Sequence, residues 1–362
     1  MIDAKNKCRY FPECGGCLYL DLDEESYQNK KREIFFDAFK RYSKTFLNIE
    51  NISRFKWIGP GSRRRLSLKV DNKNNIGFHK KLTNEIIRID KCYIAESDIS
   101  STISELQTVL YQFENFLITE IVITKFDNIV DIIFKCKREL NISQQNKLLN
   151  FAKINKINLS VNIGNKFQPL IINSKPKLKL INNLTLNLNP DIFVQATKLG
   201  EEIIAKIIYD FIINNFNKKI SLIDIYAGYG SYSFMLSNLA SKISCFEGVE
   251  SMINIIKSNI SSNSISNIFP ALRDLYLYPV SEGELNKFDL AILNPPRNGA
   301  MPQVKMLTKS LIKNFIYVSC NPETFARDSY YAIENGFKIE QITVLDQFFG
   351  SKHLELISIF KK

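Results

Sequence analysis

Several features are scarce in this 362-residue sequence, and each absence narrows the classes of protein to consider. The chain has only two histidines, His79 and His353, so it is poorly supplied for a metal site that mixes cysteine and histidine. No apolar run approaches the roughly 20 residues that a membrane-spanning helix needs. The first residues also lack the apolar segment of a secretory signal peptide, so we expect a cytoplasmic protein that does not enter membranes.

The composition that is present is that of a globular protein with an excess of positive charge. Hydrophobic residues make up 45% of the chain and charged residues 23%, which predicts buried cores, and the length favours two domains. Lysine and arginine outnumber acids by 48 to 37, for a net charge of +11. A Lys-, Asn- and Ile-rich composition accounts for part of this surplus, but clusters such as Arg63-Arg64-Arg65 favour a polyanionic partner.

The pattern of apolar residues divides the chain into three parts. Residues 1–47 hold a cysteine cluster and a helix, and residues 48–190 show short alternating strands with one helix near 95–116, which predicts a β-rich α+β domain. Residues 191–362 alternate helices with short apolar strands, which predicts an α/β domain with a doubly wound parallel sheet. Its last two strands, near 337–346 and 353–360, face each other as a hairpin.

A glycine-rich turn follows the first strand of the α/β domain, where open sheets of this class bind ligands. The turn reads Asp224-Ile-Tyr-Ala-Gly-Tyr-Gly-Ser231 and leads into a helix expected over 231–241. Gly228 and Gly230 allow close approach of a ligand, whereas Ser233 stands where the third glycine of a dinucleotide site is expected. A pyrophosphate site is therefore disfavoured.

Two acids compete for the ribose of a nucleoside ligand at the tip of the second strand, Glu247 and Glu250. We choose Glu250, because Ser251 is a good N-cap and would leave Glu250 at the junction of strand and helix. Asp274 follows the third strand and either faces an adenine or caps a surface turn.

Asn294-Pro-Pro-Arg297 ends the fourth strand, and the prolines turn the chain out so that Asn294 faces the pocket. Amino-group methyltransferases have an aromatic residue after Asn-Pro-Pro, whereas Arg297 stands at that position here. That class is therefore an alternative only. Cys320 ends the fifth strand directly before a helix that Pro322 opens. The positive end of that helix should lower the pKa of the thiol, which favours a nucleophile over a buried apolar cysteine.

Seven cysteines in a reducing compartment do not indicate a disulfide framework. Cys136 and Cys245 are expected on strands in the core. Four others are expected to form a four-thiolate metal site, whose spacing does not separate zinc from an iron–sulfur cluster: Cys8, Cys14, Cys17 and Cys92.

These motifs together resemble the uracil-C5 RNA methyltransferase family. The resemblance rests on the four cysteines, Phe193-Val-Gln195, the glycine-rich turn, Gly248-Val-Glu250, Asn294-Pro-Pro-Arg, Ser319-Cys-Asn-Pro and His353-Leu-Glu355. It implies a Rossmann-like catalytic domain with a mostly parallel seven-stranded sheet, and S-adenosylmethionine as the methyl donor. The cysteine cluster begins at residue 8, where longer members carry an RNA-binding TRAM module, which is similar to the shorter branch that methylates large-subunit ribosomal RNA.

The resemblance also implies a role for each candidate residue. Cys320 attacks uracil carbon 6, Glu355 removes the proton from carbon 5, and Gln195 and Asn294 hold the polar edge of the base. S-adenosylmethionine contacts a larger set, comprising Gln195, Tyr226, Gly228, Gly230, Ser231, Glu250, Asp274 and Asn294. The four cysteines hold a 4Fe-4S cluster, with zinc as the alternative. Ribosomal RNA is the expected substrate, transfer RNA the alternative, and the protein is expected to be a monomer. A catalytically silent RNA-binding factor held together by the metal is a further alternative.

Overall fold

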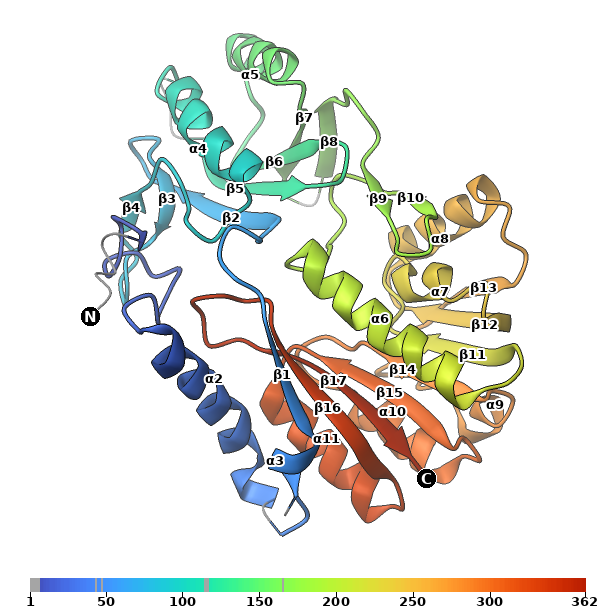
Figure 1. Ribbon diagram of the computed structural model, residues 1–362. Helices are drawn as coiled ribbons and strands as arrows, with labels where there is room; N and C mark the ends of the chain where they lie inside the picture. The colour runs from blue at the N-terminus through green and yellow to red at the C-terminus, as the bar shows by residue number, and fades with distance from the viewer. Residues whose placement is uncertain (1–6, 43, 47, 114–116, 165) are drawn as a thin grey trace.

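The computed structural model describes residues 7–42, 44–46, 48–113, 117–164 and 166–362, which form two large β-sheets with helices packed against them (Figure 1). The larger sheet has eight strands and lies in the lower half of the figure, and a seven-stranded sheet lies above it. A two-stranded sheet, β9 (Lys177–Lys179) and β10 (Thr185–Asn187), lies beside helix α8.

The eight-stranded sheet has the order β1-β16-β17-β15-β14-β11-β12-β13. Its strands are β1 (Ser53–Trp57), β11 (Ile220–Ile225), β12 (Ala240–Glu247), β13 (Ile268–Leu272), β14 (Leu290–Leu293), β15 (Asn314–Ser319), β16 (Lys338–Asp346) and β17 (Glu355–Lys361). Neighbours pair in parallel except β17, which is antiparallel to both β15 and β16. The strand order reverses between β11 and β14, so a ligand crevice is expected at their carboxyl ends.

Helices cover both faces of this sheet, because successive strand residues point to opposite sides. Leu222 packs into one core, together with α6 (Lys198–Asn215), α7 (Ser231–Met235) and α8 (Glu250–Ser262). Ile223 packs into the other core, with α2 (Glu24–Phe39), α3 (Ile49–Ile52), α9 (Glu282–Leu285), α10 (Met301–Lys309) and α11 (Pro322–Glu334). A short 3-10 helix, η1 (Lys40–Tyr42), follows α2.

The seven-stranded sheet has the order β4-β3-β2-β5-β6-β7-β8 and is antiparallel except for the pair β6 and β7. Its strands are β2 (Arg65–Val70), β3 (Ile76–His79), β4 (Ile86–Arg88), β5 (Ile118–Lys125), β6 (Val130–Cys136), β7 (Asn158–Ile163) and β8 (Lys166–Ile171). Residues of α4 (Ser97–Leu110) and α5 (Ile142–Ile154) share its core.

The predicted α/β class is confirmed, and so is the hairpin of the last two strands. The large sheet has eight strands rather than seven, because β1 adds to its edge beside β16. The helix expected over 231–241 ends at Met235, and Ala240 already belongs to β12. The helix expected near 95–116 ends at Leu110, and residues 114–116 lie outside the described residues. Both α2 and β1 pack with the large sheet, although they precede the predicted catalytic domain in sequence. The domain boundaries at residues 48 and 191 stay a prediction.

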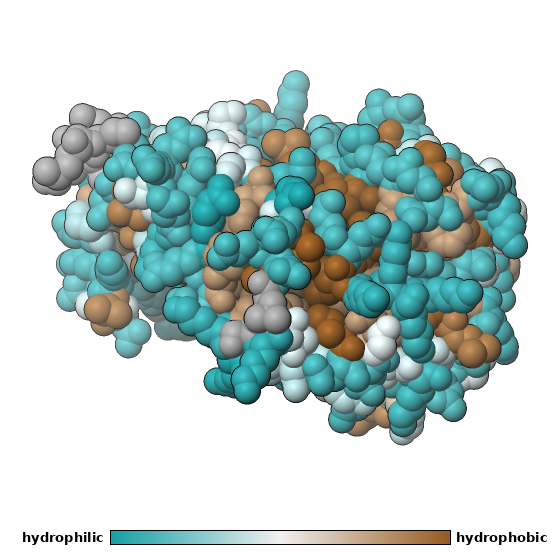
Figure 2. All heavy atoms as spheres, turned by 60° about the horizontal axis from the view of Figure 1, so that its bottom comes forward, coloured by the Kyte–Doolittle hydropathy of each residue, from teal (hydrophilic) through white to brown (hydrophobic). Residues whose placement is uncertain are grey.

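Hydrophilic residues cover most of the face seen in Figure 2, and apolar residues gather near its middle. None of the helices in the described parts of the chain has the length and apolarity that crossing a membrane requires.

Candidate active site

The glycine-rich turn leaves the carboxyl end of β11 in a conformation that L-residues rarely adopt. Tyr226, Gly228 and Gly230 have φ values of 65°, 57° and 82°. A Cβ at Gly230 would come within 3.1 Å of the Ile256 side chain on α8, so this position needs glycine for space as well. The amides of Tyr226 and Ala227 donate to the Phe246 carbonyl, which fixes the turn against β12.

Glu247 is the acid that contacts this turn. Its carboxylate accepts a hydrogen bond from the Gly228 amide at 2.9 Å and from the amides of Gly248 and Val249 at 2.8 and 3.0 Å. Glu250, which we predicted for this place, is exposed in the first turn of α8. The expected N-cap at Ser251 is wrong, because Val249 occupies the cap position and the helix begins at Glu250.

Asp224 is a site residue that the sequence analysis did not select. It is fully buried at the end of β11, and its Oδ2 accepts a hydrogen bond from Ser233 Oγ at 2.6 Å. Burial raises the pKa of this carboxyl to about 6. Asp224 Oδ1 and the Tyr226 hydroxyl are buried and have no hydrogen-bond partner among the residues that the structure describes. The turn therefore offers two polar groups to a ligand.

The other predicted cofactor residues lie around the same edge of the sheet. Ser231 follows the turn directly as the first residue of α7 and is half-buried. Asp274 is exposed, and its Oδ1 accepts from the amides of Tyr276 and Leu277, which is the turn-capping role that we weighed against adenine binding. Asn294 is half-buried, and its backbone N–H donates to the Ile225 carbonyl at 3.2 Å. That bond places Asn294 beside the end of β11.

Glu355 and Gln195 are joined by a third residue, Gln347, which the sequence analysis missed. Gln347 Nε2 donates to Glu355 Oε2 at 2.9 Å and to Gln195 Oε1 at 3.1 Å. Glu355 is the first residue of β17 and is 3% exposed. Burial raises the pKa of Glu355 to about 7, and the hydrogen bond from Gln347 opposes that rise. A carboxyl with such a pKa can exchange a proton near neutral pH.

Cys320 lies directly after β15 and before α11, whose N-cap is Asn321 and whose first residue is Pro322, as expected. Burial raises the pKa of its thiol, and the charge of nearby Glu355 raises it further, while Arg297 acts in the opposite direction. The lowered pKa that we expected from the helix N-terminus is therefore wrong. Arg297, four residues after the end of β14, is the cation available to favour the thiolate.

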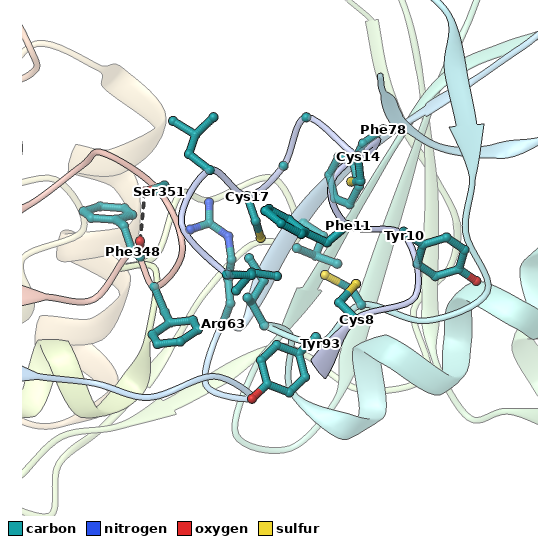
Figure 3. Close-up of a pocket in the computed structure, with 18 of the residues that line it drawn as sticks. Cys8, Tyr10, Phe11, Cys14, Cys17, Arg63, Phe78, Tyr93, Phe348 and Ser351 are labelled. Carbon is teal, nitrogen blue, oxygen red and sulfur yellow. Dashed lines mark hydrogen bonds between the residues drawn. The ribbon is translucent and has the colours of Figure 1, made fainter. Parts of the chain in front are cut away.

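The four predicted ligand cysteines line one cavity of about 370 Å³, shown in Figure 3. The cysteine segment is fixed to β3 by a hydrogen bond from the Gly15 backbone amide to the His79 carbonyl. The backbones of Cys14 and Lys80 also form an isolated antiparallel β-bridge. Burial, together with neighbouring Cys92, Cys14 and Cys8, raises the pKa of Cys17 to about 12. No three His, Cys, Asp or Glu side chains within the described ranges gather closely enough to hold a metal ion.

The chain is similar to several known RNA methyltransferases. Residues 280–362 match the family described as tRNA (Uracil-5-)-methyltransferase. A 23S rRNA (uracil(1939)-C(5))-methyltransferase RlmD of Shewanella woodyi is 26% identical over 98% of this chain and 81% of its own length. A protein of the same name from Haemophilus influenzae is 28% identical over 98% of this chain and 81% of its own length.

Among solved structures, the tRNA (uracil-54, C5)-methyltransferase of Pyrococcus abyssi in complex with S-adenosyl-L-homocysteine aligns with a TM-score of 0.71. The two proteins are 21% identical, and the alignment covers 96% of this chain and 86% of that one. The described chain therefore has the fold of that methyltransferase.

Proposed function

This chain belongs to the uracil-C5 RNA methyltransferase family, and on that premise we propose that it methylates carbon 5 of a uracil in RNA. The observation that carries the proposal is the placement of Cys320 directly after β15 and of Glu355 at the start of the neighbouring strand β17, close enough for the Glu355 charge to raise the pKa of the Cys320 thiol. This reaction needs a nucleophile and a proton acceptor that can both reach the same uracil ring.

The residues at the turn fit S-adenosylmethionine. Asp224 Oδ1 and the Tyr226 hydroxyl are unpartnered within the described residues, and Gly228 and Gly230 leave room for close approach. Glu247 replaces Glu250 as the proposed ribose acid, because its carboxylate contacts the turn. Ser231, Asp274 and Asn294 complete the proposed set. S-adenosylmethionine bound there supplies the methyl group as an electrophile.

The side chains of this protein carry the remaining chemistry. The Cys320 thiolate forms a bond to uracil carbon 6, which moves electron density to carbon 5 and makes it nucleophilic. After carbon 5 is methylated, Glu355 accepts the proton from that carbon, and the bond between Cys320 Sγ and carbon 6 breaks. Gln195 and Asn294 hold the polar edge of the base. Because Gln195 Oε1 already accepts from Gln347, its N–H donors are the groups left for a uracil carbonyl.

The four-cysteine cavity supports a proposed 4Fe-4S cluster. A single tetrahedral zinc with Zn–S distances near 2.3 Å holds its sulfur atoms about 3.8 Å apart, so the ligands must gather tightly. The described thiols line one cavity without gathering in that way. Four cysteine thiolates are the usual ligands of an iron–sulfur cluster and would hold one here. The proposed ligands are Cys8, Cys14, Cys17 and Cys92, and they would tie the N-terminal segment to the β-rich sheet.

Ribosomal RNA is the proposed substrate, since the curated relatives that cover 98% of this chain are named for 23S rRNA. The test is to incubate the full chain with a 23S rRNA transcript and labelled S-adenosylmethionine, and to digest the product for mass spectrometry. We expect 5-methyluridine. A methyl group on a base nitrogen would support the Asn-Pro-Pro alternative, and failure to bind S-adenosylmethionine in calorimetry would support a silent RNA-binding factor.

A further inference from the structure

A groove of about 550 Å³ lies between the end of α2 and the start of α11, with Cys320 in its wall. Three cationic side chains from different elements line it. Arg41 comes from η1, Arg297 from the segment after β14, and Lys352 from the loop between β16 and β17, and all three are exposed. None of the three forms an ion pair with an acid in the part of the chain that the structure describes.

The electrostatics of this groove favour an anion. Asp37 lines it too, but its carboxylate is paired with Lys40 at 2.6 Å, so Glu323 is left to oppose three cations. Burial lowers the pKa of His353 in the groove wall, and the charges of Arg297 and Lys352 lower it further. The positive charge is therefore concentrated beside the proposed nucleophile.

We propose that this groove binds the sugar–phosphate backbone of the RNA next to the target uridine, with Arg41 and Lys352 contacting phosphates. The proposal rests on the proposed function, because it requires that the target uracil reaches Cys320 while the RNA strand continues beyond the target nucleotide. Guanidinium and ammonium groups suit phosphate oxygens, and an extended strand needs a charged groove of this kind.

The experiment compares the double variant R41E/K352E with the control K242E/K313E, which makes the same change in net charge. Lys242 in β12 and Lys313 before β15 are exposed near the amino ends of their strands, away from the ligand edge. The probe is a fluorescent 12-nucleotide oligouridine, titrated by anisotropy across a series of salt concentrations. Each lost phosphate contact should reduce the salt slope by about 0.7, so R41E/K352E should lose about 1.4 and bind at least about tenfold more weakly.

Equal affinity and equal salt slope in R41E/K352E and K242E/K313E would overturn the groove proposal. The proposed function is judged separately, by whether the unmodified chain forms 5-methyluridine in a 23S rRNA transcript. A chain that methylates RNA while both double variants bind the oligouridine alike would therefore refute the groove and leave the reaction standing.

A second observation concerns Gln347, whose amide is held between the proposed base and the proposed base-binding amide. Gln347 is 2% exposed, and its Nε2 donates to both Glu355 and Gln195. Its side chain packs against the start of α6, where a Cβ added at Gly200 would come within 2.5 Å of Gln347 Oε1. Close packing and two hydrogen bonds therefore fix the orientation of the Gln347 side-chain amide.

We also propose that Gln347 is a positioning residue, which fixes the Glu355 carboxylate in the orientation that the proton transfer requires. It acts through Glu355 and does not itself touch the reacting atoms. The titratable groups facing Glu355 from packed elements are Cys320 at the end of β15 and Tyr232 in α7.

The test is Q347M, which has similar volume but cannot donate a hydrogen bond, with Q341M in β16, the strand that ends just before Gln347, as the control. Gln347 lowers the pKa of Glu355, so its loss should raise that pKa and move the rise in product-release rate to higher pH. We expect release at pH 7 to slow about tenfold or more with an unchanged KM for RNA, and G200A, which crowds the Gln347 amide, to act in the same direction.

A pH profile of Q347M identical to that of Q341M would overturn the positioning role. Urea unfolding of each variant shows whether the fold is kept, and G200A provides a second route should Q347M fold poorly. If the unmodified chain itself forms no 5-methyluridine, the result counts against the proposed function and not against the role of Gln347.

Discussion

At the scale of single residues, the two glutamates after β12 show how much one local contact decides. Glu247 accepts three backbone hydrogen bonds around the glycine-rich turn, whereas Glu250 is exposed at the start of a helix. The sequence offered both acids at nearly the same place, and the choice depended on the N-cap. Serine is a common cap, but here the helix begins one residue before Ser251.

Alanine substitutions at the two positions test this assignment. E247A should weaken binding of S-adenosylmethionine by about tenfold or more, because a charge-assisted hydrogen bond contributes about 1.5 to 3 kcal/mol. E250A should change the affinity less than about twofold. Isothermal calorimetry measures both, with urea unfolding as the check that E247A keeps its fold. A larger loss in E250A than in E247A would return the ribose role to Glu250.

Other site residues were beyond prediction for a physical reason. Gln347 is an ordinary polar residue in the sequence, and its role arises only because β16 and β17 pair so that position 347 lies against Glu355. Asp224 did carry a signal, since it opens the glycine-rich turn, but its unpartnered oxygen depends on burial. Cys320 and Glu355 could be selected from the sequence, because Cys320 directly follows a strand, Glu355 begins one, and each belongs to a motif.

At the scale of elements, the loop from Gln347 to Leu354 connects α2, the cysteine segment and the active site. Lys31 of α2 is fully buried and pairs with Asp346 at 2.7 Å, while also donating to the His353 carbonyl at 2.9 Å. The Leu18 amide donates to the Gly350 carbonyl at 2.7 Å. One end of the loop therefore depends on a buried ion pair, and its middle on the cysteine segment.

Removal of Lys31 should be costly for this loop. K31M leaves the buried Asp346 carboxylate without its cation, which should lower the free energy of unfolding by about 3 to 5 kcal/mol. The double variant K31M/D346N should recover part of the loss, since it removes the unpaired charge. Urea unfolding measures both. A loss below about 1 kcal/mol in K31M would show that the pair is dispensable.

The pattern of elements was largely predictable where local periodicity governs it. The hairpin strands β16 and β17 lie within a few residues of the expected ranges near 337–346 and 353–360. The addition of β1 to the large sheet was not predictable, because residues 53–57 look like the strands of the β-rich domain that follow them in sequence. Pairing with β16, together with the packing of Phe55 beside Phe35 and Phe36 of α2, places that strand at the other sheet.

At the scale of the whole molecule, the cysteine cavity joins three regions that are far apart in sequence. Cys8, Cys14 and Cys17 come from the N-terminal segment and Cys92 from the loop after β4, and Phe348 and Ser351 of the 347–354 loop lie across the cavity (Figure 3). Gly350 packs so closely on Cys17 that an added Cβ would lie 3.2 Å from its sulfur. A metal centre there would stiffen the contact between both sheets.

Anaerobic purification tests that role. The full chain should contain about four iron and about four sulfide per molecule, and C92S should lose them. C136A, in which a cysteine outside the cavity is changed, should keep them. C92S should also be cleaved faster by protease near residues 7–20, while its affinity for S-adenosylmethionine stays unchanged. Zinc in the unmodified chain, without iron or sulfide, would contradict the cluster.

The central claim is the covalent role of Cys320, and trapping with RNA that carries 5-fluorouridine tests it most directly. Fluorine replaces the proton that Glu355 removes, so the account predicts a stable bond between Cys320 and carbon 6 after methylation, seen as a band of protein joined to RNA in denaturing gels. C320A should form no such band and no 5-methyluridine, although it binds S-adenosylmethionine normally. Methylation by C320A at the rate of the unmodified chain would contradict the account.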